Sequence, residues 1–296
     1  MSQPHHGDVT VRRLEPADLT ATEAVSAWTF DDADRRTRRV SDSEPKPRTA
    51  DESAMWIERA LHFLTHDPGG CWIAARDDDV IGFALSQNRG ACWYLWTYGV
   101  APGHQGNGVG AAMMAAVLAH ADGRPGILFS TVHPGATRRY RLAGFELHPQ
   151  MRPVGHVDRT GIPAVSGLRD GDADDIEWMD ELDERRRGGG HGPDHELLLA
   201  TEHLTVSRPP RPGYVYTRDD GGPTLLAADD TTTASDLLND ALAGTPGPTL
   251  VNCITAQNHW AIDVGLTARL DIGQEGYLAL RGLAPPAPYL PSGHFL

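Results

Sequence analysis

Apolar and polar positions along the first half of the chain fall into short blocks whose period switches between two and about three and a half residues. Apolar residues from Met55 to Leu64 follow helical spacing, whereas alternating blocks predict strands. The acidic triplet 77–79 predicts a hairpin turn, and the polar, proline-containing segment 31–48 predicts a loop. The predicted elements are a strand at 8–14, helices at 15–30 and 51–67, strands at 71–77, 79–87 and 91–100, a helix from about 107, a strand at 126–132, a helix at 135–145 and a strand at 146–148. This order predicts a mixed, mainly antiparallel sheet with helices packed on it.

The second half of the chain repeats this plan. Its predicted elements are a helix at 176–188, a hairpin at 213–230, a helix at 233–244, a strand at 249–255 and a helix at 256–266. We expect Gly144 and Gly265, 121 residues apart, to end corresponding helices. A repeat of this length indicates two copies of one fold rather than a solenoid. We therefore predict two tandem α/β (α+β) domains, 1–154 and 155–296, with 155–163 as a crossing strand or a linker.

Length and composition narrow the class of protein. The 296 residues are 40% hydrophobic, which supports a packed core in one or two domains. The longest apolar runs, such as 111–119, fall far short of the roughly 20 residues that cross a bilayer. Residues 1–8 show no secretion signal, and Cys71, Cys92 and Cys253 fit reduced thiols. We therefore expect a cytoplasmic protein with no membrane partner.

The net charge of −14 is unevenly distributed. Residues 1–160 carry 17 basic and 19 acidic side chains, whereas residues 161–296 carry 9 basic and 21 acidic ones. An acidic chain argues against a nucleic-acid partner, and the asymmetry supports two modules. The excess of acid in the second half fits either attraction of a cationic substrate or simple solubility.

Four glycines fall within eight residues directly before an apolar helix, in the stretch VAPGHQGNGVGAAMM at 100–114. The first amides of a helix have no partners within the helix, and its dipole adds partial positive charge there. Glycines at 106, 108 and 110 let phosphate oxygens reach those amides without meeting a Cβ atom. The pattern therefore predicts an anion site suited to a pyrophosphate. A structural turn is the alternative.

Two familiar phosphate motifs do not fit this loop. A dinucleotide fingerprint needs G-x-G-x-x-G after the first strand of a parallel unit, and a Walker loop needs a lysine after its glycines. Gln105 to Gly110 instead resembles motif A of the GCN5-related N-acetyltransferases (GNAT), Q/R-x-x-G-x-G/A. Tyr140 followed by RLAGF is similar to a second segment of that family, R-x-Y-x-x-x-G-F. The resemblance covers about residues 8–150 and implies two tandem GNAT-like domains, since the second half shares the order of elements.

The resemblance implies acetyl-CoA, or another acyl-CoA, as cosubstrate, and we expect no metal. In the family the pantetheine arm pairs with the end of the fourth strand, where a backbone N–H near Val100 would face the thioester oxygen. Gly99 fits a bulge or a close approach there, and Tyr94, Trp96 and Tyr98 are expected on one strand face. The implied cofactor-binding residues are Tyr98, Gly99, Val100, Gln105, Gly106, Asn107, Gly108, Val109, Gly110 and Ala111.

The resemblance also implies the catalytic groups. It places Tyr140 as the general acid for the leaving thiolate, and a phenol with an ordinary pKa of about 10 holds its proton at neutral pH. Packing against the cofactor is the alternative for Tyr140. His133 stands where the family often has an asparagine, as a base acting through water or as a hydrogen-bond partner of the pantetheine. The strand 91–100 lacks the glutamate that many relatives place there.

The second copy departs from the motifs that matter. In place of the glycine loop it has AADDTTTAS at 227–235, whose two aspartates would repel a pyrophosphate. No tyrosine matches Tyr140, because Trp260 or Ala261 falls at that place. We therefore expect a catalytic domain followed by a degenerate one. The cluster RRRGGGHGPDH at 185–195 contains two histidines and an aspartate, and we interpret it as a plain loop or substrate rim rather than a metal site.

These features predict an acyltransferase that moves an acetyl group from acetyl-CoA to a primary amine of a small molecule by direct attack. A protein N-terminal or lysine acetyltransferase is a variant of the same chemistry. A non-catalytic, acyl-CoA-binding regulatory protein is the alternative of another class, kept open by the missing strand carboxylate. We expect a monomer or a homodimer.

Overall fold

The computed structural model describes residues 9–38, 40, 43–208, 210–219 and 221–295. Residues 1–8, in which the sequence shows no secretion signal, lie outside this set. Among the described residues, no helix is both long enough and apolar enough to cross a bilayer. The chain divides into an N-terminal unit (Met1–Asn88, Trp93–Gly126 and Val132–Gly144) and a C-terminal unit (Arg89–Cys92, Ile127–Thr131 and Phe145–Leu296).

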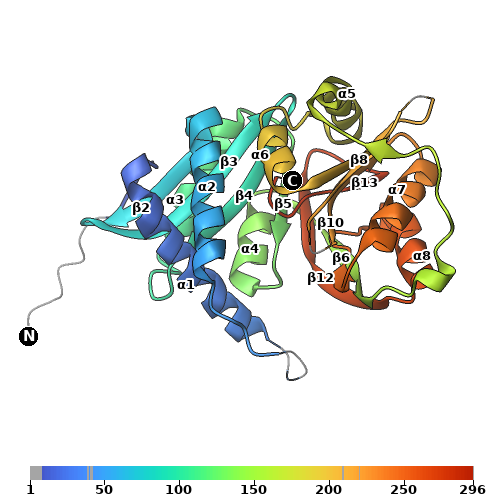
Figure 1. Cartoon of the computed structure of the whole chain (residues 1–296). Helices are drawn as coiled ribbons and strands as arrows, with labels where there is room; N and C mark the ends of the chain where they lie inside the picture. Colours follow the sequence, from blue (N-terminus) through green and yellow to red (C-terminus); the bar gives the residue numbers. More distant parts are fainter. Residues whose placement is uncertain (1–8, 39, 41–42, 209, 220, 296) are drawn as a thin grey trace, which may run out of the picture. The chain divides into compact units, whose positions relative to one another are not determined.

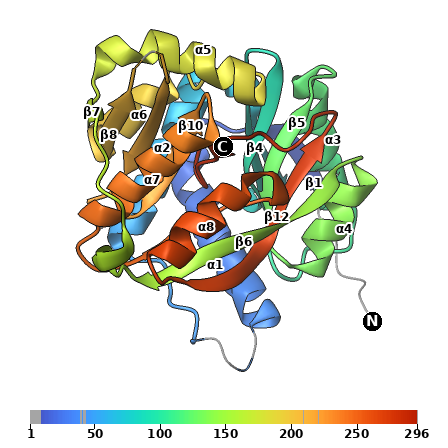
Figure 2. The same ribbon diagram turned by 90° about the vertical axis from the view of Figure 1, so that its right-hand side faces the viewer.

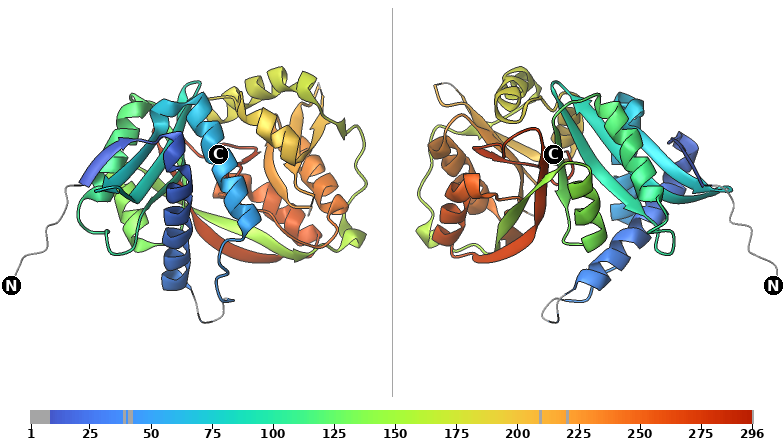
Figure 3. Two further views of the ribbon diagram at one scale, coloured as in Figure 1. Left: turned by 60° about the vertical axis from the view of Figure 1, so that its left-hand side comes forward. Right: turned by 180° about the vertical axis from the view of Figure 1, so that it is seen from behind.

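The N-terminal unit contains four neighbouring strands in the order β1, β2, β3, β4, with helices on both faces. Phe83 faces Phe30 and Trp56 on one side, whereas the adjacent Gly82 lies against Met113 on the other. Figure 3 shows α1 and α2 in front of the sheet in one view and α3 in front of it in the other. The bounds are β1 Val9–Arg13, α1 Leu19–Thr37, α2 Ala50–His66, β2 Cys71–Arg76, β3 Asp79–Arg89, β4 Cys92–Val100, α3 Val109–Ala121 and α4 Pro134–Leu142.

The expected loop at 31–48 is shorter than predicted, because α1 continues to Thr37. Two ion pairs at helical i,i+4 spacing lie in this extension, Asp31 with Arg35 at 2.8 Å and Asp32 with Arg36 at 2.9 Å. Such pairs stabilise a helix by a few tenths of a kcal/mol each. The polar composition that indicated a loop therefore belongs to an exposed helix end.

The C-terminal unit contains two groups of neighbouring strands, β13-β10-β9-β8-β7 and β5-β12-β6-β11. The long strands β6 and β12 pair antiparallel, from Glu146 with Leu280 to Val154 with Asp271. Figure 2 shows them side by side, with α8 against them. The bounds are β5 Gly126–Ser130, β6 Glu146–His156, β7 Arg169–Asp170, α5 Ile176–Arg187, α6 Asp194–Thr201, β8 His203–Ser207, β9 Gly213–Thr217, β10 Pro223–Ala228, α7 Thr231–Gly244, β11 Pro248–Leu250, α8 His259–Thr267, β12 Asp271–Arg281 and β13 Tyr289–Leu290.

The element order of the first half recurs in the second, as the labels of Figure 1 allow the reader to follow. Helices α4 and α8 have nine residues each, the strands after them have eleven each, and both pairs are offset by 125 residues. The expected offset of 121 is therefore wrong. Gly265 lies inside α8, where a Cβ atom would come within 2.6 Å of Pro153. With the offset of 125 residues, the position that corresponds to Tyr140 is Gly265 and not Trp260 or Ala261.

The predicted fold class is confirmed: mixed α/β, with mostly antiparallel sheets and flanking helices, consistent with tandem GNAT-like domains. The predicted boundary at 154/155 and the roles of the two domains stay predictions. Helix α6 and strands β7, β8, β12 and β13 were not predicted. Helix α6 and strand β8 lack the clear periodicity on which the other elements were assigned.

Candidate active site

The glycine loop joins β4 to α3 and has a backbone that only glycine adopts readily. Gly103, Gly106 and Gly108 have φ angles of 84°, 82° and 86°. A Cβ atom built at any of the three would meet no atom within 4 Å. Glycine is thus required here by the positive φ angle and not by crowding from the protein. The space beside the loop backbone is open to a ligand.

The start of α3 leaves backbone donors without partners inside the helix. Gly108 is the N-cap residue, in the left-handed conformation and with no side chain to cap the helix. The amide of Ala112 is bonded to the Gly108 carbonyl at 3.0 Å, so those of Val109, Gly110 and Ala111 precede the first intrahelical bond. Together with the helix dipole, these amides are donors of the kind that the predicted anion site requires.

Tyr98 fixes the start of α3 to the end of β4. Its hydroxyl donates to the Gly110 carbonyl at 2.8 Å. A Cβ atom at Gly110 would lie 2.4 Å from the Tyr98 hydroxyl oxygen, so crowding by Tyr98 requires a glycine at this position. The Gln105 side chain also ties the loop to β4, donating from Nε2 to the Val100 carbonyl at 2.9 Å. Four of the predicted cofactor-binding residues thus hold the loop in place through one another.

Strand β4 does not keep Trp96 and Tyr98 on one face, so that expectation is wrong. Trp96 stacks on Phe63 of α2, with ring centroids 4.9 Å apart, whereas Tyr98 reaches the start of α3. Gly99 faces the α1 side, since a Cβ there would lie 2.7 Å from the Phe83 ring. The alternation of faces therefore shifts by one residue between Trp96 and Tyr98. Such a shift is what a β-bulge produces, and it aims Tyr98 toward the glycine loop.

Tyr140 lies on α4 beside Tyr98, with ring centroids 6.0 Å apart and 5% of its surface exposed. Burial raises the pKa of the Tyr140 phenol well above its usual value, and the neighbouring Tyr98 adds to the effect. Burial likewise raises the pKa of Tyr98, to about 12. Both hydroxyls therefore hold their protons throughout the physiological pH range. The site has two neutral phenols side by side, and the Tyr98 proton is already donated to the Gly110 carbonyl.

His133 is the N-cap residue of α4, seven positions before Tyr140. Its carbonyl accepts from the Thr137 amide at 3.1 Å, and its side chain is half-buried against Gly135. The backbone therefore has the capping role expected at this position. The structure brings His133 and Tyr140 onto one short helix in the N-terminal unit. Their roles stay predictions.

The cluster at 185–195, interpreted from the sequence as a plain loop or a substrate rim, contains the end of α5, a connecting loop and the start of α6. His191 and His195 are both fully buried, and each has a carboxylate within ion-pair distance. Glycine-rich composition is typical of surface loops and does not indicate burial. The one indication in the sequence was the His-x-x-Asp-His spacing itself.

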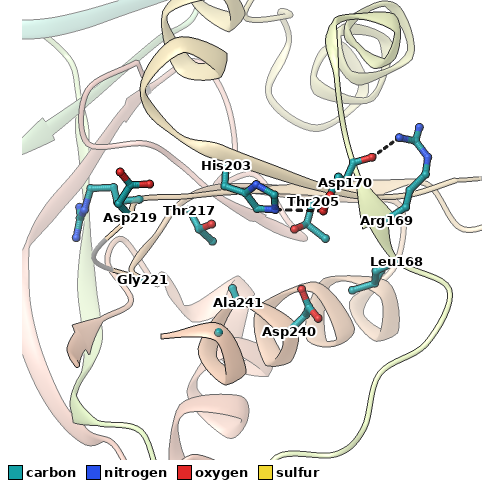
Figure 4. A pocket seen from close by; sticks show the side chains of 12 residues that line it. Leu168, Arg169, Asp170, His203, Thr205, Thr217, Asp219, Gly221, Asp240 and Ala241 are labelled. Carbon is teal, nitrogen blue, oxygen red and sulfur yellow. Dashed lines mark hydrogen bonds and ion pairs between the residues drawn. The ribbon is translucent and has the colours of Figure 1, made fainter. Parts of the chain in front are cut away.

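A pocket of about 360 Å³ in the C-terminal unit was also not predicted. It lies between the strands β7 to β9 and helix α7, and none of the predicted site residues lines it (Figure 4). His203 and Asp170 meet there at 3.4 Å, and Asp240 faces them from α7. Burial and the nearby Asp170 raise the pKa of Asp240, which His203 partly offsets.

The whole chain shares its fold with several solved acetyltransferase structures. The first, a putative acetyltransferase from Pyrococcus horikoshii, has a TM-score of 0.74 and 15% identity, with 99% of each chain covered. A GCN5-related N-acetyltransferase from Kribbella flavida has a TM-score of 0.62 and 18% identity over 94% of this chain and 72% of its own. One from Sphaerobacter thermophilus has a TM-score of 0.57 and 14% identity over 95% and 96%. These similarities extend across both units.

No curated protein matches the chain in sequence. The model of the acetyltransferase (GNAT) family does match, over residues 32–145, a range that includes β4, the glycine loop, α3 and α4. The predicted resemblance is therefore confirmed for this part of the chain. Residues 32–145 form a domain of the acetyltransferase (GNAT) family.

Proposed function

We propose that this protein transfers an acetyl group from acetyl-CoA to the primary amine of a small molecule. The family of residues 32–145 implies acetyl transfer from acetyl-CoA. The observation that supports the finer proposal is the open start of α3, where three amides without an intrahelical partner follow three positive-φ glycines. A pyrophosphate is an anion of the size and charge that such a site accepts. The catalytic domain, on this proposal, is the one predicted at 1–154.

On this proposal, the residues of the glycine loop would bind acetyl-CoA, and the phenols of Tyr98 and Tyr140 would take part in the chemistry. The amides of residues 106–111 would hold the pyrophosphate and so fix the thioester near the end of β4. A backbone N–H near Val100 would stabilise the oxyanion as the amine attacks the carbonyl carbon. The new C–N bond forms first, and the C–S bond breaks as the tetrahedral intermediate collapses. Tyr140 would give its proton to the departing sulfur, and the proton lost by the amine would pass to water or to His133.

The burial of Tyr140 is compatible with a role as a proton donor and argues against a role as a base. Because burial raises its pKa, the phenol remains protonated throughout the physiological pH range. The raised pKa also makes the phenol a weaker acid, so it would donate a hydrogen bond to the developing thiolate and give up its proton only as the C–S bond breaks. Tyr98 beside it is kept neutral in the same way. It would position the acid without competing for the proton.

One observation favours a second function, an acyl-CoA-binding regulatory protein without turnover. Strand β4 has no carboxylate to serve as a base, and Tyr140 is 95% enclosed by protein. A protein of this kind would use the same anion site and would release no CoA. The acceptor would then be absent, and binding alone would carry the function.

The experiment is an assay of CoA-thiol release with a panel of primary amines, paired with calorimetry of acetyl-CoA binding. Tyr140→Phe should lower kcat by about 10²- to 10⁴-fold with little change in Kd. Tyr277→Phe, on β12, is the matched control and should leave both values unchanged. Binding without release above the blank for any amine would instead establish the regulatory function. Absence of binding for acetyl-CoA would overturn both.

A further inference from the structure

The connection between α5 and α6 encloses a cluster of side chains that acetyl transfer does not use. Asp183 comes from α5, His191 from the connecting loop and His195 from α6, and all three are fully buried. Each offers one potential ligand atom, and these three atoms lie within 4.8 Å of one another. Among the described residues, this is the group of histidine and acidic side chains with such a spacing.

Hydrogen bonds already orient each member of the cluster. His191 Nδ1 lies 2.6 Å from Asp183 Oδ2, and the Tyr214 hydroxyl lies 2.8 Å from both oxygens of that carboxylate. His195 Nδ1 lies 3.0 Å from the Tyr216 hydroxyl. Metal-binding histidines are typically oriented in this way, by a carboxylate or hydroxyl on one ring nitrogen. The same is true of metal-binding carboxylates.

The protein does not satisfy this cluster by itself. The Nε2 atoms of His191 and His195 are buried and make no hydrogen bond within the described part of the chain. The nearest acceptor to His195 Nε2 is Asp180 Oδ1, at 3.3 Å. Leaving a buried polar atom unpaired costs about 1 to 3 kcal/mol, so two such atoms side by side are unusual in a native core. A further group with an affinity for imidazole nitrogen would remove this cost.

The chemistry of the donors suits a metal cation. Imidazole nitrogen and carboxylate oxygen are donors that Zn²⁺ and its neighbours in the transition series accept.

The loop around the cluster is held by contacts that involve none of the three candidate ligands' side chains. Arg187 donates to the carbonyls of Gly189 and Gly190 at 2.8 and 3.0 Å. Arg89 makes a two-pronged ion pair with Asp194, at 2.8 and 3.1 Å, and donates to the His191 carbonyl. The ligand side chains are therefore presented by a framework that folds around them, as a structural metal site requires.

We propose that Asp183, His191 and His195 bind a divalent transition-metal ion, with Zn²⁺ the expected occupant and Asp180 the nearest fourth donor. In a tetrahedral centre with bonds of about 2.1 Å, the ligand atoms are about 3.4 Å apart, so ligand atoms that now lie up to 4.8 Å apart would close in on binding. The site is enclosed, with no open position for substrate, which assigns it a structural role. It fastens the loop between α5 and α6 to both helices.

The test is the metal content and metal response of the full chain. Protein purified without a histidine tag and dialysed against Zn²⁺ should retain about one equivalent by elemental mass spectrometry. Substituting Co²⁺ should give the strong visible absorption of a tetrahedral site with nitrogen and oxygen donors. Dipicolinate should lower the thermal midpoint of unfolding by several degrees. None of these readouts depends on acetyl-transfer activity.

Two variants and two controls make the result specific. His191→Gln and His195→Gln should each lose the ion and the Co²⁺ spectrum, whereas His203→Gln, an exposed histidine of the same unit, should keep both. A variant with His5 and His6 replaced by alanine removes the only adjacent histidine pair in the sequence and should also keep the ion. The proposal would be overturned if the wild type retained less than a tenth of an equivalent of Zn²⁺. It would also be overturned if His191→Gln and His195→Gln retained as much Zn²⁺ as the wild type.

Discussion

Helices α3 and α7 occupy the same place in the order of elements of the two halves of the chain, but only α7 has a side chain that caps its first turn. Helix α3 begins after Gly108, which has no side chain to cap it. Helix α7 begins after Asp230, whose carboxylate accepts from the Thr233 amide and hydroxyl, both at 2.8 Å. Arg211 lies 3.5 Å from the same carboxylate. The first turn of α7 thus has an anion from its own chain, the Asp230 carboxylate, whereas the first turn of α3 is free to accept an anion from a ligand.

The difference shows how one backbone device serves either binding or stability. The first amides of any helix need an acceptor. When the chain supplies a capping aspartate, the helix gains stability and the site is filled. When the chain supplies a positive-φ glycine, the helix loses that cap and the amides remain available to a ligand. The proposed division between a cofactor-binding copy and a degenerate copy follows from this contrast.

The largest expected effect comes from placing a negative charge at the start of each helix in turn and comparing acetyl-CoA binding. Gly108→Glu should weaken acetyl-CoA binding by at least about 100-fold, because a carboxylate repels the pyrophosphate and the positive φ angle of 86° disfavours a side chain. Thr232→Glu, in the first turn of α7, should leave binding within about twofold. Calorimetry with acetyl-CoA measures both. Equal losses from the two variants would show that the C-terminal copy also binds the ligand.

Much of this contrast could be predicted from the sequence, because it is local. The glycine loop, the missing second loop and the helix that follows each depend on residues close together in the chain. The pairing of β6 with β12 could not be predicted, since it joins residues that are 117 to 134 positions apart. Hydrophobic periodicity and composition depend on residues that are close together in the chain, so they do not identify strands that pair across a long separation.

The errors in the site have the same origin. The offset between the copies was set from two glycines, and the structure shows that one of them, Gly265, is required by close packing against Pro153. The expected single face of β4 is wrong because the alternation of faces shifts between Trp96 and Tyr98. The burial of His191 and His195 could not be predicted, because it depends on Asp183 and two tyrosines, which come from other elements.

A second prediction tests whether the start of α3 must be held in place, and its expected effect is smaller. Gly110→Ala should weaken acetyl-CoA binding by about tenfold, because the new Cβ would lie 2.4 Å from the Tyr98 hydroxyl oxygen and force the helix start away from β4. Tyr98→Phe should cost about as much as one hydrogen bond, roughly 1 kcal/mol or fivefold. Titration calorimetry of each variant gives the two values.

The double variant gives this second prediction its control. If crowding by the hydroxyl is the cause, Gly110→Ala in the Tyr98→Phe background should add little further loss, since the clashing atom is absent. Such non-additivity is the mark of two groups in contact. Losses that simply add would show that Gly110 acts on the ligand independently of Tyr98. The role assigned to Tyr98 as a fixing residue would then be wrong.

The smallest expected effect concerns the stability of α7. Asp230→Ala removes the cap and should lower the free energy of unfolding by about 1 kcal/mol at pH 7, as capping aspartates typically contribute 0.5 to 2 kcal/mol. Asp263→Ala, an exposed residue of α8, should change it by no more than about 0.5 kcal/mol. Urea titrations followed by circular dichroism measure both. Acetyl-CoA binding should be unaffected by either substitution.

The pH dependence identifies the carboxylate as the cause of that loss. Burial would raise the pKa of Asp230, but the hydrogen bonds from Thr233 and the contact with Arg211 outweigh it and hold the pKa below its ordinary value of 3.8. A group whose pKa falls on folding stabilises the folded state above its unfolded pKa and loses that contribution as the pH falls through its folded pKa. The gap between wild type and Asp230→Ala should therefore be full above about pH 5 and shrink steadily below about pH 4. A gap that stayed constant down to pH 2 would mean that alanine acts through packing, and that α7 does not depend on its own anion.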